Sequence, residues 1–209
     1  MMWFYGDPAA VRLATNGLRK SCVRWLLAIG LIASSVPVVS SRADELLVTA
    51  GRGPQPGSGQ RNETVGFDYS FYRFERSERQ HISVGVSYTR LETNAAVNDS
   101  LYAVSVYPQI TLYPSATSRI AAHSPRWAAP FFFVRALGPS YISEGRLGSR
   151  RQAEHFSFQA QVGVGVQLNP GADRRAEMAV SWKHFSNANL NRHNDGFDMP
   201  LVISLGMTF

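Results

Sequence analysis

Cysteine and charge are scarce in this sequence. Its 209 residues include one cysteine, Cys22, and only 17% are Asp, Glu, Lys or Arg. Because Cys22 lies near the N-terminus, the rest of the chain must fold without a disulfide. The five histidines are scattered, and no spacing of ligand residues predicts a metal site. We therefore expect neither a metal nor another cofactor.

The N-terminal segment has the order of residues typical of a secretory signal. Basic residues up to Arg24 precede an apolar run over 25–39, and small residues follow it, up to Ala43. The apolar run is shorter than the ~20 residues of a membrane-spanning helix. The sequence predicts a signal peptide over 1–43 that is removed, leaving one domain over 44–209. A retained N-terminal anchor is the alternative.

The basic character of the chain comes largely from this leader. The whole sequence has 21 Lys and Arg against 15 Asp and Glu, and without the five bases and one acid of residues 1–43 the balance is 16 against 14. A nearly neutral domain gives no electrostatic footprint for nucleic acid. We therefore do not expect nucleic acid as a partner.

Alternation of apolar and polar residues with a period of two dominates the chain after the leader. For example, Val162 and Val164 alternate with Gln161 and Gly163, which is typical of a strand with two unlike faces. No segment with a helical period competes with this pattern. Alternating segments occur at about 45–51, 63–75, 80–91, 100–113, 127–138, 154–168, 174–187 and 198–209.

Two all-β architectures fit eight strands of this kind. In a soluble barrel or sandwich the apolar faces point inward, whereas in a transmembrane barrel they point outward toward lipid. The polar faces here are rich in Gly, Ser, Gln and Thr and poor in the Lys and Glu of a water-exposed surface. The last alternating segment, from Met199 to Phe209, also resembles the C-terminal assembly signal of outer-membrane barrels. The sequence predicts an eight-stranded antiparallel transmembrane β-barrel in the bacterial outer membrane.

Barrel topology assigns each connection to one side of the membrane. With both termini in the periplasm, odd strands run outward and even strands run back. The predicted extracellular loops are 52–62, 92–99, 139–153 and 188–197. The predicted periplasmic connections are 76–79, 114–126 and 169–173, of which the second is long for a turn.

The tripeptide H-x-S occurs three times, and strand parity separates the copies. The copies at 81–83 and 155–157 have the phase of the small polar residues, so we expect both to face the lumen. The copy at 184–186 continues the apolar series that includes Val180 and Trp182, so we expect it to face lipid. Polar groups facing lipid are unfavourable unless they have a function or lie in the headgroup zone.

The residues after the third copy point to its function. Residues 184–198, "HFSNANLNRHNDGFD", resemble the signature of the lipid A 3-O-deacylases, the PagL-type enzymes, which carry H-x-S-N-A late in an eight-stranded outer-membrane barrel. The resemblance implies hydrolysis of the ester at the 3-position of lipid A, with release of a 3-hydroxy fatty acid. It also implies lipopolysaccharide of the outer leaflet as the membrane partner.

Carried over to this chain, the resemblance assigns a role to each polar residue of the motif. It makes Ser186 the nucleophile, His184 the general base and Asp198 the acid that orients the imidazole. It makes the Asn187 side chain and the backbone N–H of Asn189 the donors to the oxyanion. Two residues depart from the family pattern, since glutamate is usual at 198 and glycine at 189. Asp198 is also out of phase with the residues after it, so a bulge or loop must turn it toward His184.

Four arginines are candidates for binding the phosphates of the substrate. Arg146, Arg150 and Arg151 lie in one predicted outer loop, and Arg192 lies beside the motif. Guanidinium groups bind phosphate oxygens well. The alternative for each arginine is a solvated position on a loop.

Two other functions stay open at this point. A catalytically silent barrel would act as an adhesin or structural protein through its outer loops. A soluble periplasmic barrel would instead bind a ligand in its interior. The oligomeric state is open as well, and a homodimer is compatible with the sequence.

Overall fold

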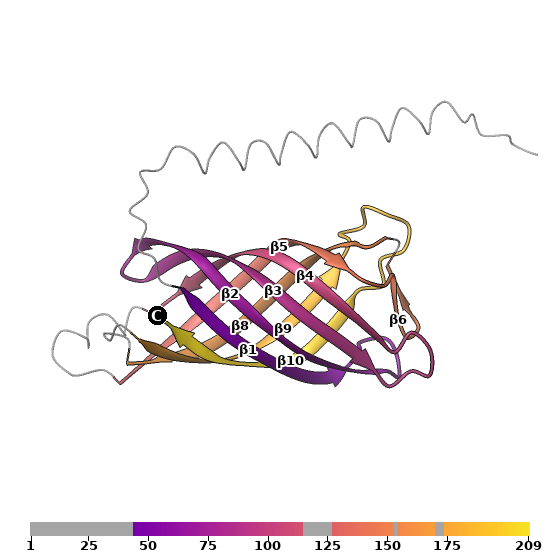
Figure 1. Ribbon diagram of the computed structural model, residues 1–209, viewed down its shortest axis with the longest axis horizontal. Helices are drawn as coiled ribbons and strands as arrows, with labels where there is room; N and C mark the ends of the chain where they lie inside the picture. The colour runs from indigo at the N-terminus through magenta and orange to yellow at the C-terminus, as the bar shows by residue number, and fades with distance from the viewer. Residues whose placement is uncertain (1–43, 115–126, 153, 170–173) are drawn as a thin grey trace, which may run out of the picture. The chain divides into compact units, whose positions relative to one another are not determined.

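The structure, a computed structural model, describes residues 44–114, 127–152, 154–169 and 174–209, which form a closed antiparallel barrel (Figure 1). Its eight strands lie in the cyclic order β1-β10-β9-β8-β5-β4-β3-β2. They are β1 (Glu45–Pro54), β2 (Arg61–Ser77), β3 (Gln80–Thr93), β4 (Ser100–Leu112), β5 (Ala128–Ile142), β8 (Phe156–Leu168), β9 (Arg175–Ser186) and β10 (Phe197–Thr208). A separate hairpin of β6 (Arg146–Leu147) and β7 (Arg150–Arg151) lies between β5 and β8.

Pairing of the first and last strands closes the barrel. The register of β1 and β10 runs from Glu45 opposite Thr208 to Gly51 opposite Val202. A closed ladder lets the backbone N–H and C=O groups of each strand bond to neighbouring strands. Figure 1 shows the C-terminus at one end of the barrel, which we call the turn end, and β6 at the other, the loop end. The loop end carries the connections β1–β2, β3–β4, β5–β8 and β9–β10.

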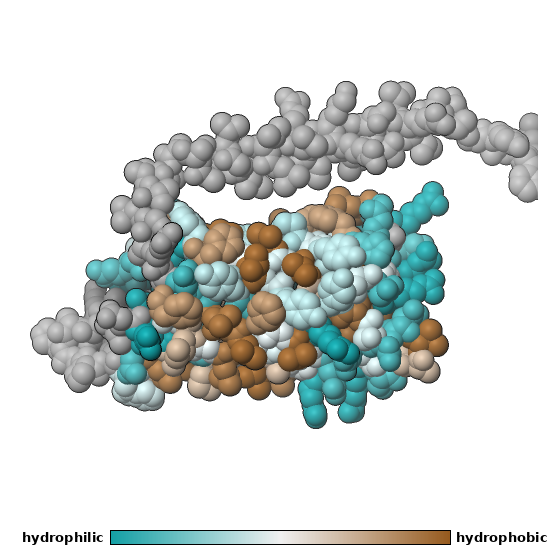
Figure 2. Space-filling model, in the orientation of Figure 1, coloured by the Kyte–Doolittle hydropathy of each residue, from teal (hydrophilic) through white to brown (hydrophobic). Residues whose placement is uncertain are grey.

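The predicted alternation gives the barrel an apolar exterior and a polar interior. On β8, Val164 points outward and is 60% exposed, whereas Gln161 points inward and is 2% exposed. On the face that Figure 2 shows, apolar side chains lie across the middle of the barrel and hydrophilic ones gather at the loop end. This exterior is suited to hydrocarbon. The prediction of an all-β, eight-stranded antiparallel transmembrane barrel is confirmed.

Bulges invert the alternation in β2, β5 and β10, and those in β2 and β10 correct the predicted directions of individual side chains. In β2 the register shifts between Ser70 and Tyr72, after which Arg73 points inward. In β10 the register shifts between Met199 and Val202. Met199, which the sequence pattern placed on the lipid face, is therefore buried. One extra residue reverses the face of every residue on one side of it, because the side-chain period is two.

A network of charged and polar side chains fills the middle of the interior. Asp68 accepts hydrogen bonds from Arg135 and, at 2.6 Å, from Ser87. Lys183 Nζ lies 4.0 Å from Asp68 Oδ1, and Arg135 Nε donates to Gln109 Oε1 at 2.6 Å. All five side chains are buried. Their mutual pairing offsets the unfavourable transfer of charge out of water.

An apolar cluster fills the interior at the loop end. Leu147 of β6 is 1% exposed, so the small hairpin is anchored by this side chain. Phe185 of β9 lies opposite Phe197 of β10, and both point into the cluster. The loop-end cluster consists of Leu91, Leu101, Ala103, Ile142, Leu147, Phe185, Phe197, Met199 and Val202. It therefore lies directly behind the outer wall formed by the ends of β9 and β10.

Several predictions lie outside the described residues. They are the signal peptide at 1–43 and most of the connections at 114–126 and 169–173. In the described part of the chain, no helix is both long enough and apolar enough to cross a membrane.

Single introduced cysteines can test the orientation of the barrel, because residues 44–209 contain none. Arg192 is exposed at the loop end, and Glu78 is exposed in the turn between β2 and β3. We expect a membrane-impermeant maleimide to label Arg192→Cys on intact cells and Glu78→Cys only after permeabilisation. The reverse pattern would show that the loop end faces the periplasm.

Candidate active site

Among the three H-x-S copies, the third places both polar side chains on the outer wall. His81 and Ser83 point into the barrel and are 8% and 5% exposed, and Ser157 is completely buried. His184 and Ser186 lie on the outer face of β9 and are partly exposed. Parity within the strands predicted these positions correctly.

His155 is the exception, because it does not lie in the lumen as predicted. It precedes the first residue of β8, is exposed, and stacks on Tyr141 with ring centroids 5.8 Å apart. Its Nδ1 lies 2.9 Å from the carbonyl oxygen of Ile142. The parity rule fails for this residue because it holds only inside a regular strand.

A carboxylate and an imidazole meet on the outer wall at the loop end. Asp198 is opposite His184 in the register, and His184 Nδ1 lies 2.9 Å from Asp198 Oδ1. Since an ionised carboxylate only accepts, Nδ1 carries the proton and Nε2 is the basic nitrogen. Ser186 follows His184 on the same face of β9, about 7 Å further along the strand. The hydroxyl and the imidazole thus share one side of the wall.

The bulge in β10 explains how Asp198 reaches this face. Before the bulge, Asp198 is turned toward His184, while Phe197 and Met199 on either side of it point inward. After the bulge, Leu201 is on the outer face. Without the shift in register, Asp198 would share the inward phase of the even-numbered residues of β10. The bulge or loop that the sequence required at this point is present.

Trp182 contacts both members of the acid–base pair. Its indole Nε1 donates to Asp198 Oδ1 at 3.1 Å. Its ring also stacks on His184, with centroids 5.4 Å apart and an angle of 28° between the planes. The sequence placed Trp182 on the lipid face but assigned it no role. In the structure it fixes the relative positions of the carboxylate and the imidazole.

Two amide side chains, which no sequence pattern singles out, hold Asp198 from the other side. Gln55 Nε2 donates to Asp198 Oδ2 at 3.0 Å, and the Asp198 N–H donates to Gln55 Oε1 at 2.9 Å. Asn62 Nδ2 donates to Asp198 O at 2.9 Å and to Gln55 Oε1 at 2.7 Å. No local motif marks these contacts, because Gln55 lies 143 positions from Asp198.

Gly196 leaves the space that the imidazole occupies. Its φ is +69°, and a Cβ at this position would lie 2.7 Å from His184 Cε1. Any other residue here would be strained and would displace the ring. The glycine thus leaves room for the His184 imidazole, a role beyond that of a turn residue.

Asparagine side chains hold the turn after β9. Asn187 Nδ2 donates to the His193 carbonyl at 2.7 Å, and Asn187 Oδ1 accepts from the Asn189 N–H at 3.0 Å. Asn189 has a φ of 59°, a conformation that asparagine tolerates. The Asn189 N–H therefore already has an acceptor, which differs from the expectation that it points toward a substrate. Asn187 Nδ2 carries a second hydrogen that can serve as a donor.

The four candidate arginines have different surroundings at the loop end. Three have exposed side chains: Arg146, Arg151 and Arg192. Arg150 instead donates through Nη2 to the Pro56 carbonyl at 3.0 Å, which ties the β6–β7 hairpin to the first loop. The Arg151 N–H donates to Asp195 Oδ2 at 2.7 Å, which ties the same hairpin to the loop after β9. The described residues contain no group of three or more His, Cys, Asp or Glu that could hold a metal ion.

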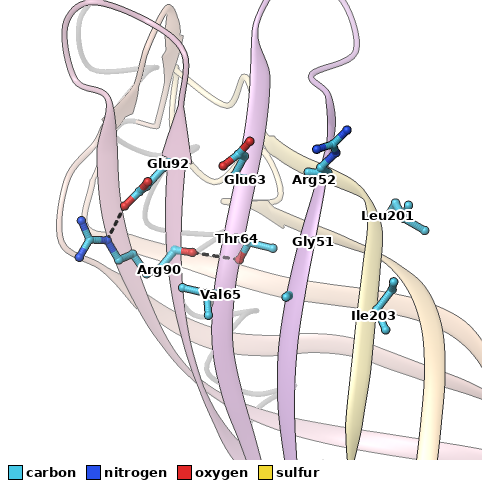
Figure 3. A pocket seen from close by; sticks show the side chains of 10 residues that line it. Gly51, Arg52, Glu63, Thr64, Val65, Arg90, Glu92, Leu201 and Ile203 are labelled. Atoms are coloured by element: carbon cyan, nitrogen blue, oxygen red, sulfur yellow. Dashed lines mark hydrogen bonds and ion pairs between the residues drawn. The ribbon is translucent and has the colours of Figure 1, made fainter.

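A groove of about 520 Å³ indents the outer wall across β1, on the other side of β10 from β9. Figure 3 shows apolar side chains such as Val65 and Ile203 along one part of it, and charged ones toward the loops. Arg90 Nε and Glu92 Oε1 form an ion pair of 2.8 Å in the charged part. The change from apolar to charged lining is that expected where hydrocarbon meets a polar layer.

Comparison with known families places this motif in one of them. A family model described as lipid A 3-O-deacylase (PagL) matches residues 83–208, a range that contains His184, Ser186 and Asp198. No curated protein matches the chain. Nothing in the comparisons supports a homodimer.

Two solved structures share the fold. The outer membrane enzyme PagL superposes with a TM-score of 0.52 at 17% identity, covering 80% of this chain and 99% of that one. Neisserial surface protein A (NspA) superposes with a TM-score of 0.52 at 14% identity, covering 82% of this chain and 100% of that one. The barrel resembles an enzyme and a surface protein equally well, so the side chains must discriminate between functions.

A serine-directed probe can test whether Ser186 is activated. We expect a fluorophosphonate to modify Ser186, because an adjacent base makes a serine hydroxyl nucleophilic. Labelling should disappear in Ser186→Ala and in His184→Asn, as read by mass spectrometry of the modified peptide. The matched control is Ser157→Ala in the other "HFS", which should be labelled like the wild type. Equal labelling of Ser186→Ala and the wild type would show that the serine is not activated.

Proposed function

The chain belongs to the lipid A 3-O-deacylase (PagL) family, and we propose that it hydrolyses the ester-linked acyl chain at the 3-position of lipid A. The reaction releases a 3-hydroxy fatty acid and uses Ser186, His184 and Asp198 as nucleophile, base and acid. The protein works in the bacterial outer membrane, with lipopolysaccharide of the outer leaflet as its substrate. No metal or other cofactor takes part in these steps.

One observation carries this proposal: the acid–base pair and the serine lie on the exterior of the barrel. His184 and Ser186 occupy the outer face of β9 at its loop end, in line with Trp182 and Val180. An ester group of a lipid can reach this surface without entering the barrel. A buried or lumenal triad would be inaccessible to a membrane lipid.

The first step of the proposed reaction forms an acyl-enzyme. His184 Nε2 accepts the proton of the Ser186 hydroxyl as the oxygen attacks the ester carbonyl carbon. The resulting imidazolium stays hydrogen-bonded through Nδ1 to the Asp198 carboxylate, which stabilises its charge. Collapse of the tetrahedral intermediate breaks the bond between the acyl carbon and the 3-oxygen of the sugar, and His184 gives its proton to this leaving oxygen, which becomes the 3-hydroxyl. In the second step, His184 activates a water that releases the fatty acid from Ser186.

Asn187 is the proposed donor to the oxyanion. Its side chain is held by contacts to His193 and Asn189, so the amide is fixed before substrate binds. A preorganised donor stabilises the developing negative charge without reorganisation. We propose that the second Nδ2 hydrogen of Asn187 takes this role, and that the Asn189 N–H orients the amide. Direct donation by Asn189 requires its N–H to leave Asn187 Oδ1.

The exposed arginines provide the proposed contacts to the phosphates of lipid A. Arg146 and Arg151 face each other in the β6–β7 hairpin, and Arg192 is in the loop that follows the serine. Hydrogen bonds between Arg151 and Asp195 hold the two loops together. Arg150 serves mainly to tether the hairpin, because its guanidinium donates to a backbone carbonyl.

An adhesin or structural role remains the competing function, since NspA shares the fold equally well. A soluble ligand-binding barrel fits the apolar exterior poorly, because Val164 and similar residues would be exposed to water. Lipid A from cells with and without the protein separates the enzyme from the adhesin. Loss of one 3-hydroxyacyl group, seen by mass spectrometry, is the expected result for the enzyme.

Substitution of the triad tests the mechanism. We expect Ser186→Ala and His184→Asn each to lower lipid A deacylation at least about 1,000-fold, with the barrel still folded. Asp198→Ala should have a smaller effect, because the acid orients and stabilises the imidazole without bonding to substrate. Asp198→Glu restores the residue usual in the family and should retain activity. Rates are measured by mass spectrometry with purified lipid A, and folding by heat-dependent gel mobility.

Ser157→Ala is the matched control for the triad variants. Ser157 has the same local sequence, "HFS", but its side chain is buried inside the barrel. We expect its replacement to leave deacylation unchanged. Loss of activity in Ser157→Ala, with activity kept in Ser186→Ala, would contradict the assignment of the nucleophile.

Combined replacement of Arg146, Arg151 and Arg192 by glutamine tests phosphate binding. We expect KM for lipid A to rise on the order of 100-fold, since each of the three lost charge-assisted contacts contributes ~1 kcal/mol or more, while kcat stays nearly constant. Arg150→Gln alone serves as the comparison, because its side chain is tethered to Pro56. An unchanged KM in the triple variant would exclude these arginines from substrate binding.

A further inference from the structure

We propose that Gln55, from the first outer loop, is a positioning residue for the catalytic acid. The inference rests on the proposed function, because it assigns to Gln55 the orientation of Asp198 during ester hydrolysis. Gln55 does not touch the substrate in this proposal. It acts through Asp198, and Asp198 acts through His184.

The contacts of Asp198 divide between its two carboxylate oxygens. Oδ1 accepts from His184 Nδ1 at 2.9 Å and from Trp182 Nε1 at 3.1 Å. Oδ2 accepts from Gln55 Nε2 at 3.0 Å. The carboxylate plane is thus fixed from both sides, with Oδ1 toward the imidazole. Without Gln55, Oδ2 loses its donor in the described structure, and the carboxylate can rotate away from His184.

Gln55 also replaces a missing strand partner. The ladder between β1 and β10 reaches only as far as Gly51 opposite Val202, so β1 does not pair with β10 at Asp198. The Asp198 N–H instead donates to Gln55 Oε1, and the Asp198 carbonyl accepts from Asn62. Buried backbone groups require such partners. The two amides therefore fix the backbone of Asp198 beside the bulge as well as its side chain.

The short side chain of Asp198 makes its hydrogen bonds to Gln55 important. Aspartate is one methylene shorter than the glutamate usual in the family, so its carboxylate has less freedom to find the imidazole after a small backbone shift. Gln55 is 1% exposed, and both ends of its amide are engaged. A buried residue with this many contacts to one catalytic group is suited to holding that group in place.

The experiment compares Gln55→Leu with the wild type in the full-length protein. We expect kcat for lipid A deacylation to fall about 10- to 100-fold, the rate equivalent of one hydrogen bond to a charged group, with KM nearly unchanged. Gln55→Asn, which keeps a polar amide, provides a second variant if Gln55→Leu does not fold. It should lose less activity than Gln55→Leu.

Gln60→Leu is the matched control. Gln60 lies in the same loop and donates to Thr93 Oγ1 at 3.1 Å and to Leu147 O at 3.4 Å, but has no contact with the acid. We expect its kcat to equal that of the wild type. An equal loss of kcat in both glutamine variants would show that loop integrity is responsible, and would overturn the proposal.

A double-mutant cycle isolates the route through Asp198. If Gln55 acts only on the acid, Gln55→Leu should have little further effect on kcat in an Asp198→Ala background. Additive losses would overturn the proposal.

The proton on His184 Nδ1, observed by NMR in detergent micelles, gives a readout that does not depend on turnover. Gln55→Leu should shift or broaden this resonance, and Gln60→Leu should not.

The same measurements separate this proposal from the proposed function. If the wild type does not deacylate lipid A, the function is wrong, but the NMR comparison still tests whether Gln55 holds the Asp198–His184 pair. If the wild type is active and Gln55→Leu changes neither kcat nor the resonance, the function stands and the positioning role is wrong.

Discussion

Backbone hydrogen bonding in hydrocarbon is the constraint on which this structure depends. A strand that crosses a lipid layer must place its N–H and C=O groups against neighbouring strands, so the sheet closes on itself. Because closure fixes the backbone pairing, the residues along a strand differ mainly in whether their side chains point into the barrel or toward lipid. Where the ladder between β1 and β10 stops, at Gly51 and Val202, side chains must supply the partners that a strand no longer provides. Gln55 and Asn62 do so at Asp198.

The two faces of β9 show how alternation keeps the charged interior network apart from the acid–base pair on the outer wall. Lys183 points inward, donates to Thr89 at 3.3 Å and approaches Asp68, as part of the interior network. His184, the next residue, points outward and bonds to Asp198. A charged network and an acid–base pair are thus separated by the thickness of one strand. In this network Asp68 pairs with Arg135 and lies 4.0 Å from Lys183, whereas the acid–base pair lies on the opposite face of the wall.

The alternation of apolar and polar residues predicts most of the barrel. It does not predict the positions where a bulge or a strand end changes the direction of a side chain. The sequence predicts the strands, the outward face of His184 and Ser186, and the need for a bulge near Asp198. It misplaces Met199, because a bulge has no reliable signature in a single sequence and reverses the phase on one side of it. It misplaces His155, because the residue lies just outside β8.

The residues that support the candidate site could not be predicted from the sequence, for a different reason. Gln55 is an ordinary loop residue in the sequence, and only the closure of the barrel brings it to Asp198. The acceptor of the Asn189 N–H likewise depends on the rotamer of Asn187. Contacts of this kind arise from tertiary packing, so neither spacing nor composition reveals them. The family motif points to the proposed reacting groups, and it contains none of the residues that hold them.

The loop-end cluster limits the directions from which water can reach the site in the proposed reaction. Phe185, Phe197 and Met199 are all completely buried and line the inner side of the wall that carries the acid–base pair. The proposed hydrolysis of an acyl-enzyme needs a water molecule at Ser186, and an apolar backing of this kind does not favour a path for water from the lumen. The proposed mechanism therefore draws this water from the hydrated sugar and phosphate layer above the site. In the proposed mechanism, the rate of fatty acid release therefore depends on the hydration of the membrane surface.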